Sequence, residues 1–171
     1  SGLIAGAPVM SNVHFINPYI TSLSDQNFMR TQYVRRVAIE FRQCENVSVR
    51  DGVIRDIDLT NGVAFGTVNE VSQFASVSNM KFINLVHSTL DSKNIDHTTV
   101  YMMAQNSKVT DCDFTIFGDL GWRIACPVEL HDSYSEFKNS KVSGYTRGGW
   151  FVAERPNVTT KNQRISNITG T

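Results

Sequence analysis

A six-residue pattern recurs along the 171-residue chain and limits the folds that it can adopt. The clear copies are Val77–Phe82, Val109–Phe114 and Phe137–Val142, and looser copies begin at Met10, Val49 and Ile165. Each copy begins with an apolar residue, usually β-branched or aromatic, followed by a polar residue and then an Asn or Asp. The residues after the Asn or Asp lead to another apolar position. The shared Asn or Asp is Asn12, Asp51, Asn79, Asp111, Asn139 and Asn167, at intervals of 39, 28, 32, 28 and 28 residues. Such a fixed period predicts a stacked repeat architecture.

A short alternating run precedes each of the later copies. These runs are Val37–Phe41, Val63–Phe65, Val100–Met102, Val128–Leu130 and Trp150–Val152. The chain has 18 Val and 12 Ile against 7 Leu and 8 Ala, a composition that favours strands over helices. Each repeat unit is therefore predicted to contain three short strands: the alternating run, a strand that enters the Asn or Asp, and a strand that leaves it.

Three short strands cannot bury an apolar face by themselves, but they can bury it by stacking on the next unit. Equivalent strands would then pair in parallel at about 4.8 Å, with the alternating apolar residues inside. A β-propeller or a β-sandwich stays open as an alternative. The propeller would need antiparallel hairpins with regular turns, and the sandwich would not explain one Asn or Asp in register.

The recurring Asn or Asp between two short strands resembles the asparagine ladder of right-handed, single-stranded parallel β-helices, the pectate-lyase-like superfamily. The resemblance covers about residues 9–171 and is strongest to phage tailspikes and related polysaccharide depolymerases. It implies an all-β solenoid of about six coils with three short strands each. Its ladder amides would form hydrogen bonds along the axis and to the turn backbone. We expect one β-helix domain over residues 1–171, as a segment of a longer chain, because no capping helix is visible in the sequence.

Charge and cysteine content exclude several other classes. The 16 basic and 16 acidic residues balance, which argues against a nucleic-acid or anionic-membrane surface. No apolar run is long enough for a membrane span, and no signal peptide is visible. Cys44, Cys112 and Cys126 lack metal-ligand spacing, so we expect small buried thiols, no metal and no cofactor.

The resemblance implies a substrate groove outside the first strand of each coil, along Glu40, Ala64, Tyr101, Glu129 and Phe151. Glycoside cleavage needs two carboxylates about 5–10 Å apart. Glu129 is therefore the candidate general acid or nucleophile, with Asp119 or Glu154 as its partner. Glu129 and His131 are predicted to point outward from the same strand.

Two loops before these strands combine an indole with a guanidinium. Trp122 is followed by Arg123, and Arg147 precedes Trp150. Sugars stack on aromatic faces and accept charged hydrogen bonds, so the predicted substrate-binding residues are listed together here: Trp122, Arg123, Arg147, Trp150, Tyr101 and His131. The alternative interpretation is that both indoles pack inside the tube.

These observations and the resemblance imply a polysaccharide-engaging β-helix, most like a glycan-depolymerising tailspike segment that cleaves glycosidic bonds as a hydrolase or lyase. The tailspike resemblance also implies a homotrimer or a larger assembly on a virion or cell exterior. Two other functions stay open: a non-catalytic carbohydrate-binding or adhesin module, and a purely structural shaft. The family's catalytic motifs are not found, so no catalytic residue is carried over by motif.

Overall fold

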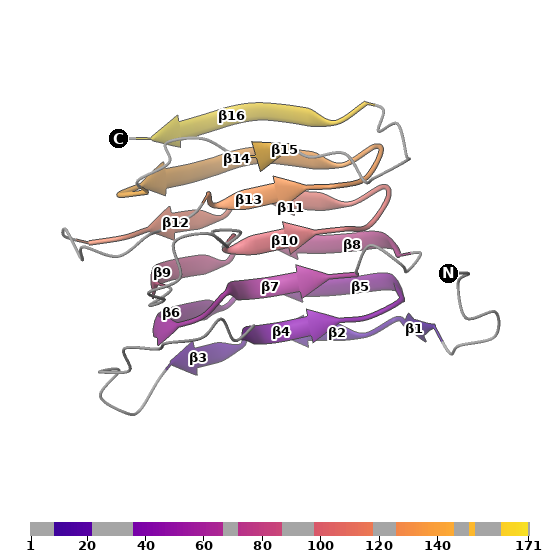
Figure 1. The fold of residues 1–171 in the computed structure, drawn as a ribbon, viewed down its shortest axis with the longest axis horizontal. Helices are drawn as coiled ribbons and strands as arrows, with labels where there is room; N and C mark the ends of the chain where they lie inside the picture. The colour runs from indigo at the N-terminus through magenta and orange to yellow at the C-terminus, as the bar shows by residue number, and fades with distance from the viewer. Residues whose placement is uncertain are drawn as a thin grey trace, which may run out of the picture.

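The computed structural model describes residues 9–21, 36–66, 72–86, 98–117, 126–145, 151–152 and 162–170. All regular structure in these ranges is β-strand, as the excess of Val and Ile predicts. The strands belong to two sheets in which every pairing is parallel (Figure 1). Within the described residues no helix is long and apolar enough to cross a membrane.

The smaller sheet, which we call sheet B, contains the alternating runs. Its strands stack in the order β15, β13, β10, β7, β4. Their bounds are β4 (Val37–Phe41), β7 (Asn61–Phe65), β10 (Val100–Met102), β13 (Val128–Leu130) and β15 (Phe151–Val152).

The larger sheet, sheet A, contains the strands on both sides of the recurring Asn or Asp. The strands before this Asn or Asp are β1 (Met10–Ser11), β2 (His14–Ile16), β5 (Cys44–Arg50), β8 (Gln73–Ser78) and β11 (Lys108–Thr110). The strands after this Asn or Asp are β3 (Tyr19–Thr21), β6 (Val53–Asp58), β9 (Lys81–Val86) and β12 (Asp113–Thr115). Two longer strands, β14 (Glu136–Ser143) and β16 (Arg164–Gly170), run through the position itself.

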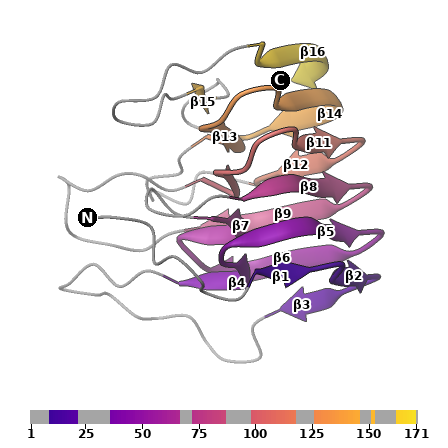
Figure 2. The ribbon, with the colours of Figure 1, turned by 90° about the vertical axis from the view of Figure 1, so that its right-hand side faces the viewer.

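Figures 1 and 2 show the strands of both sheets rising in sequence order from β3 and β4 at the bottom to β16 at the top. This arrangement is a parallel β-solenoid, and the three predicted strand types per unit are confirmed. The number of six coils stays a prediction, because segments that connect the strands lie outside the described residues.

The inside of the solenoid is made of stacked rows of apolar side chains in register. One row is Ile54, Phe82, Phe114 and Val142, and another is Phe41, Phe65, Met102 and Leu130. The rings of Phe41 and Phe65 stack at 5.2 Å, and those of Phe82 and Phe114 at 5.0 Å. Burial of these rows supplies the stabilisation that a single coil lacks.

The ladder is confirmed as a column of left-handed residues. Asp51, Asn79, Asp111, Asn139 and Asn167 all have φ between 50° and 62°, a conformation that Asn and Asp tolerate better than other side chains. Asn79 Nδ2 donates to Asp51 Oδ1 at 2.9 Å, and Asn167 Nδ2 donates to Asn139 Oδ1 at 3.0 Å. The Asn79, Asn139 and Asn167 side chains are exposed, whereas the residue after the ladder position is buried in four coils, at Gly52, Met80, Cys112 and Ser140.

The first rung of the ladder is Asn17 and not Asn12. Ile16 pairs with Arg50, and the Asn17 amide N–H donates to the Arg50 carbonyl at 2.8 Å, as the later rungs do with the coil above. Asn12 instead aligns with Asn46, and Asn46 Nδ2 donates to Asn12 Oδ1 at 2.6 Å. This register explains the irregular first interval of 39 residues, because that interval was counted from Asn12 whereas the ladder begins at Asn17.

Asn12 belongs to a second column of left-handed residues, five positions before the ladder. We call the ladder column, Asn17 to Asn167, the ladder corner. We call the other column the second corner, and its members are Asn12, Asn46, Phe74, Asn106, Tyr134 and Asn162, with φ between 50° and 62°. The second corner lies where the chain passes from sheet B into sheet A.

The three cysteines are free and buried, as their spacing predicts. Cys112 lies directly after a ladder residue, and its amide N–H donates to Ser140 Oγ at 3.1 Å. Burial raises the pKa of the Cys112 thiol to about 12. This thiol is therefore protonated at neutral pH and acts as a small core residue.

Candidate functional site

The outer face of sheet B carries the predicted column of side chains. The register aligns Glu40 with Ala64, Ala64 with Tyr101, Tyr101 with Glu129, and Glu129 with Phe151. In β13, Val128 and Leu130 belong to the apolar core, so the intervening Glu129 lies on the opposite face of the strand. The predicted alternation in β13 is thus confirmed.

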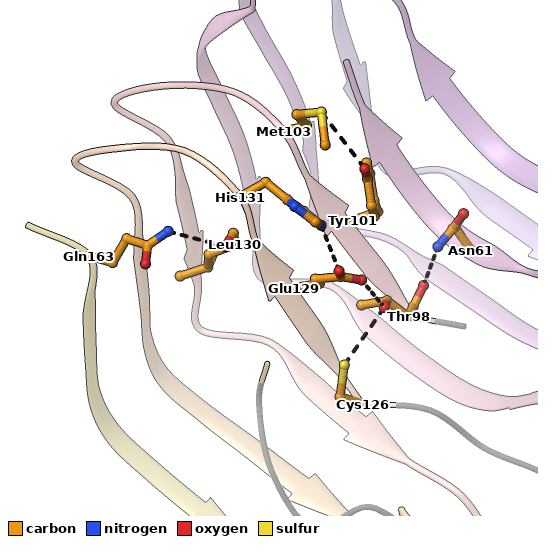
Figure 3. A network of polar contacts seen from close by, with 9 residues as sticks. All are labelled: Asn61, Thr98, Tyr101, Met103, Cys126, Glu129, Leu130, His131 and Gln163. Carbon is orange, nitrogen blue, oxygen red and sulfur yellow. Dashed lines mark hydrogen bonds and ion pairs between the residues drawn. The ribbon is translucent and has the colours of Figure 1, made fainter. Parts of the chain in front are cut away.

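Glu129 is buried, although the sequence indicates an outward, solvent-facing carboxylate. Only 7% of its side chain is exposed, and 12% of the His131 side chain. The physical reason is crowding on the outer face, where neighbouring polar and aromatic side chains lie over the strand (Figure 3). Burial of a carboxylate is unfavourable unless hydrogen bonds or charges compensate it.

Two side chains compensate the burial of the Glu129 carboxylate. The Thr98 hydroxyl donates to Oε2 at 2.8 Å. On the other oxygen, His131 Nε2 lies 2.6 Å from Oε1, at ion-pair distance but without the geometry of an ordinary hydrogen bond. Thr98 therefore donates a hydrogen bond to one carboxylate oxygen, while His131 lies against the other.

The imidazole of His131 is held on its flank by an aromatic ring. The rings of Tyr101 and His131 are 4.7 Å apart at an angle of 45°. Tyr101 lies one strand below, and its hydroxyl contacts Met103 Sδ at 3.7 Å. Tyr101, Glu129 and His131 are thus brought together, as the alternation along β10 and β13 predicts.

Polar contacts also fix the backbone around Glu129 (Figure 3). Asn61 Nδ2 donates to the Thr98 carbonyl at 2.7 Å, and the Thr98 hydroxyl lies 3.7 Å from Cys126 Sγ. Gln163 Nε2 donates to the carbonyls of Leu130 and Asp132 at 3.1 and 3.2 Å. These contacts tie four successive coils, those of β7, β10, β13 and β15, together around one carboxylate.

Three further members of this cluster, Thr98, Asn61 and Gln163, were not among the predicted site residues. One signal was available for Thr98, which occupies the position 28 residues before Cys126, ahead of the equivalent strand. No pattern in the sequence marks Asn61 or Gln163, because their amides reach other coils through the stacking register.

The remaining predicted site residues lie outside the described residues. They are Asp119, Glu154, Trp122, Arg123, Arg147 and Trp150. The predicted carboxylate pair and the indole–guanidinium loops therefore stay predictions. Among the residues that the structure describes, no group of three or more His, Cys, Asp or Glu side chains could hold a metal ion.

The described cluster has the elements of general acid–base chemistry. A carboxylate, an imidazole and a hydroxyl lie within contact distance of one another on the side of the sheet that faces away from the core. A buried carboxylate beside an imidazole can exchange a proton with it during a reaction. The same contacts also compensate the burial of the carboxylate.

Comparisons with other proteins give structural likeness without sequence likeness. No protein-family model and no curated protein sequence matches the chain. The tailspike protein of E. coli bacteriophage HK620 in complex with a pentasaccharide matches with a TM-score of 0.78 and 24% identity, over 98% of this chain and 28% of that chain. A variant of the same tailspike in complex with a hexasaccharide gives the same values. A double variant matches with a TM-score of 0.77 and 23% identity.

The chain spans about 28% of the length of the tailspike that it matches. At this level of identity the likeness concerns the arrangement of the backbone. It agrees with the parallel pairing, the two sheets and the stacked columns described above. The chain therefore has the fold of a parallel β-helix segment like that of the HK620 tailspike.

Proposed function

We propose that this chain engages a polysaccharide on the outer face of sheet B and cleaves a glycosidic bond there with Glu129. The observation that carries the proposal is the buried Glu129–His131 pair, which lies away from the apolar core. A partly desolvated carboxylate beside an imidazole is suited to hold or release a proton at a glycosidic oxygen. The bound pentasaccharide and hexasaccharide of the structural neighbours support a glycan as the ligand class.

The second carboxylate of the proposed site comes from the loops beside β13. Asp119 and Glu154 are candidates by their nearness in sequence to the same or the adjacent coil. Asp96 is a further candidate. A double variant of the HK620 tailspike replaces an aspartate and a glutamate that are 33 positions apart, and Asp96 precedes Glu129 by the same interval. Trp122, Arg123, Arg147 and Trp150 would bind the sugars on either side of the cleaved bond.

The test is the release of reducing ends from bacterial surface polysaccharides that the wild-type protein binds on a glycan array. The Glu129→Gln variant should lose about 100-fold or more of this activity and keep binding. Glu136→Gln, at a surface ion pair with Lys138 on sheet A, is the matched control and should keep full activity. Thermal melts of both variants check folding.

A non-catalytic carbohydrate-binding module is the second candidate function. The observation that favours it is that both oxygens of Glu129 already contact neighbouring side chains, Thr98 and His131, as a structural carboxylate would also need. Glycan binding without any release of reducing ends by the wild-type protein would establish this function in place of cleavage.

We also propose that the chain works within a homotrimer or a larger assembly on a virion or cell exterior. The lowest described coil exposes Phe15, Ile16 and Tyr19, an apolar surface of the kind that interfaces cover. Light scattering should give a mass of three chains, and a stable soluble monomer would contradict the trimer.

A further inference from the structure

The second corner has an aromatic residue in place of Asn at two positions. Four of its six members are Asn, but the other two are Phe74 and Tyr134, with φ of 55° and 62°. Bulky side chains are rare in this left-handed region because the Cβ atom crowds the following carbonyl oxygen. Phe74 and Tyr134 therefore hold strained conformations that Asn holds elsewhere in the same column.

Neither aromatic side chain belongs to the buried core. Each residue is 49% exposed. Within the described part of the chain, neither ring contacts another aromatic ring. Both positions also lose the side-chain bond along the column that Asn46 makes with Asn12. Among the described residues the two rings thus make neither an aromatic pair nor a bond along the column, and backbone strain that persists is typical of functional sites.

Free amide groups lie between the two rings. The register places Asn106 one strand above Phe74 and one below Tyr134, so the two aromatic residues are about 9.5 Å apart along the column. Asn106 and its neighbour Gln105 are exposed. Neither side-chain amide makes a hydrogen bond to another described residue, so both keep their donors and acceptors available.

This surface continues from the outer face of sheet B. Tyr134 follows His131 by three residues, and Gln105 follows the Met103 that contacts Tyr101. A polymer that crosses this outer face along the direction of β10 and β13 would reach the second corner beyond the ends of these strands.

We propose that Phe74, Gln105, Asn106 and Tyr134 form a second glycan-binding ridge, which holds sugars of the same polysaccharide away from the cleaved bond. Sugar rings would stack on Phe74 and Tyr134, and the two amides would bond to hydroxyl groups between them. The ligand class rests on the proposed function, whereas the site and its residues are new. Alternating aromatic rings and free amides fit a polyhydroxylated ligand better than a second copy of this chain, which would cover a continuous apolar patch.

The test compares three variants with the wild-type protein. The double variant Phe74→Asn/Tyr134→Asn restores the residue that the column otherwise uses. Its melting temperature should rise, and its affinity for the polysaccharide retained best on the glycan array should fall about tenfold. Tyr134→Phe keeps the ring and should bind as the wild type does. Phe117→Asn removes an exposed aromatic residue with ordinary backbone geometry, and should change neither property.

Each outcome decides between the proposals. Unchanged affinity of the double variant, with a wild-type protein that binds glycan, overturns the ridge and leaves the proposed function intact. Absence of glycan binding by the wild type overturns both. A double variant that dissociates in light scattering, with unchanged glycan affinity, identifies the ridge as a subunit interface and overturns its glycan role.

Discussion

The ladder corner and the second corner have the same backbone conformation but different side chains. Each corner is a column with one left-handed residue per coil. In the sequence, the residue of the second corner lies five positions before that of the ladder corner. The ladder corner uses only Asn and Asp, whereas the second corner accepts Phe74 and Tyr134. The backbone therefore requires a left-handed residue at both corners. The side-chain bonds along the column are a separate contribution, made at Asn79–Asp51 and Asn167–Asn139 in the ladder corner and, among the described residues of the second corner, at Asn46–Asn12.

The largest effect should come from breaking the ladder corner. Asn139→Leu removes the acceptor for Asn167 Nδ2 and places a bulky residue at a φ of 52°. Loss of one exposed hydrogen bond and the added backbone strain should lower the free energy of unfolding by about 1–2 kcal/mol. Chemical denaturation measures this change.

Asn106→Leu is the matched control at the second corner. It adds the same backbone strain, but the Asn106 amide has no bond to another described residue. Its loss of stability should be the smaller of the two. An equal loss in both variants would show that the stacked amides contribute nothing beyond tolerance of the left-handed conformation.

A smaller effect of opposite sign is expected at the second corner. Tyr134→Asn relieves the strain of a bulky residue at a φ of 62°. The free energy of unfolding should rise by about 0.5–1 kcal/mol. Chemical denaturation again gives the value, and a loss of stability would show that the Tyr134 ring packs more favourably than its exposure indicates.

The smallest expected effect is on the loss of folding stability at low pH. Hydrogen bonds from Asn79 and then Arg50 lower the pKa of Asp51, and bonds from Asn84 and then Arg55 lower the pKa of Asp56. A carboxylate with a lowered pKa in the folded state stabilises the protein above its unfolded pKa near 4 and loses this contribution as the pH falls through the folded value.

Asp51→Asn should therefore reduce the loss of stability between about pH 4 and pH 2, because it removes one such group from the ladder corner. Thermal melts across this range compare the variant with the wild type. The second corner has no acidic residue, so Asn106→Gln there should leave the acid response as it was. An unaltered acid response in Asp51→Asn would contradict the stabilising role of this carboxylate.

The period of the pattern favoured a stacked solenoid over a propeller or a sandwich, and the resemblance to an asparagine ladder named the fold as a parallel β-helix. The pattern misplaced Asn12, since Asn12 and Asn17 both suit a left-handed turn and local sequence does not set the register. Alternation along β13 put Glu129 and His131 on one face. Their burial depends on Thr98 and Tyr101, which reach them from another coil, and such contacts leave no local pattern in the sequence.

The most direct test of the proposed function is a crystal structure of the Glu129→Gln variant with a fragment of the polysaccharide that the wild-type protein cleaves. The account predicts a glycosidic oxygen within about 3 Å of the residue 129 carboxamide, on the outer face of sheet B. A fragment bound elsewhere, with no sugar near residues 129 and 131, would contradict it.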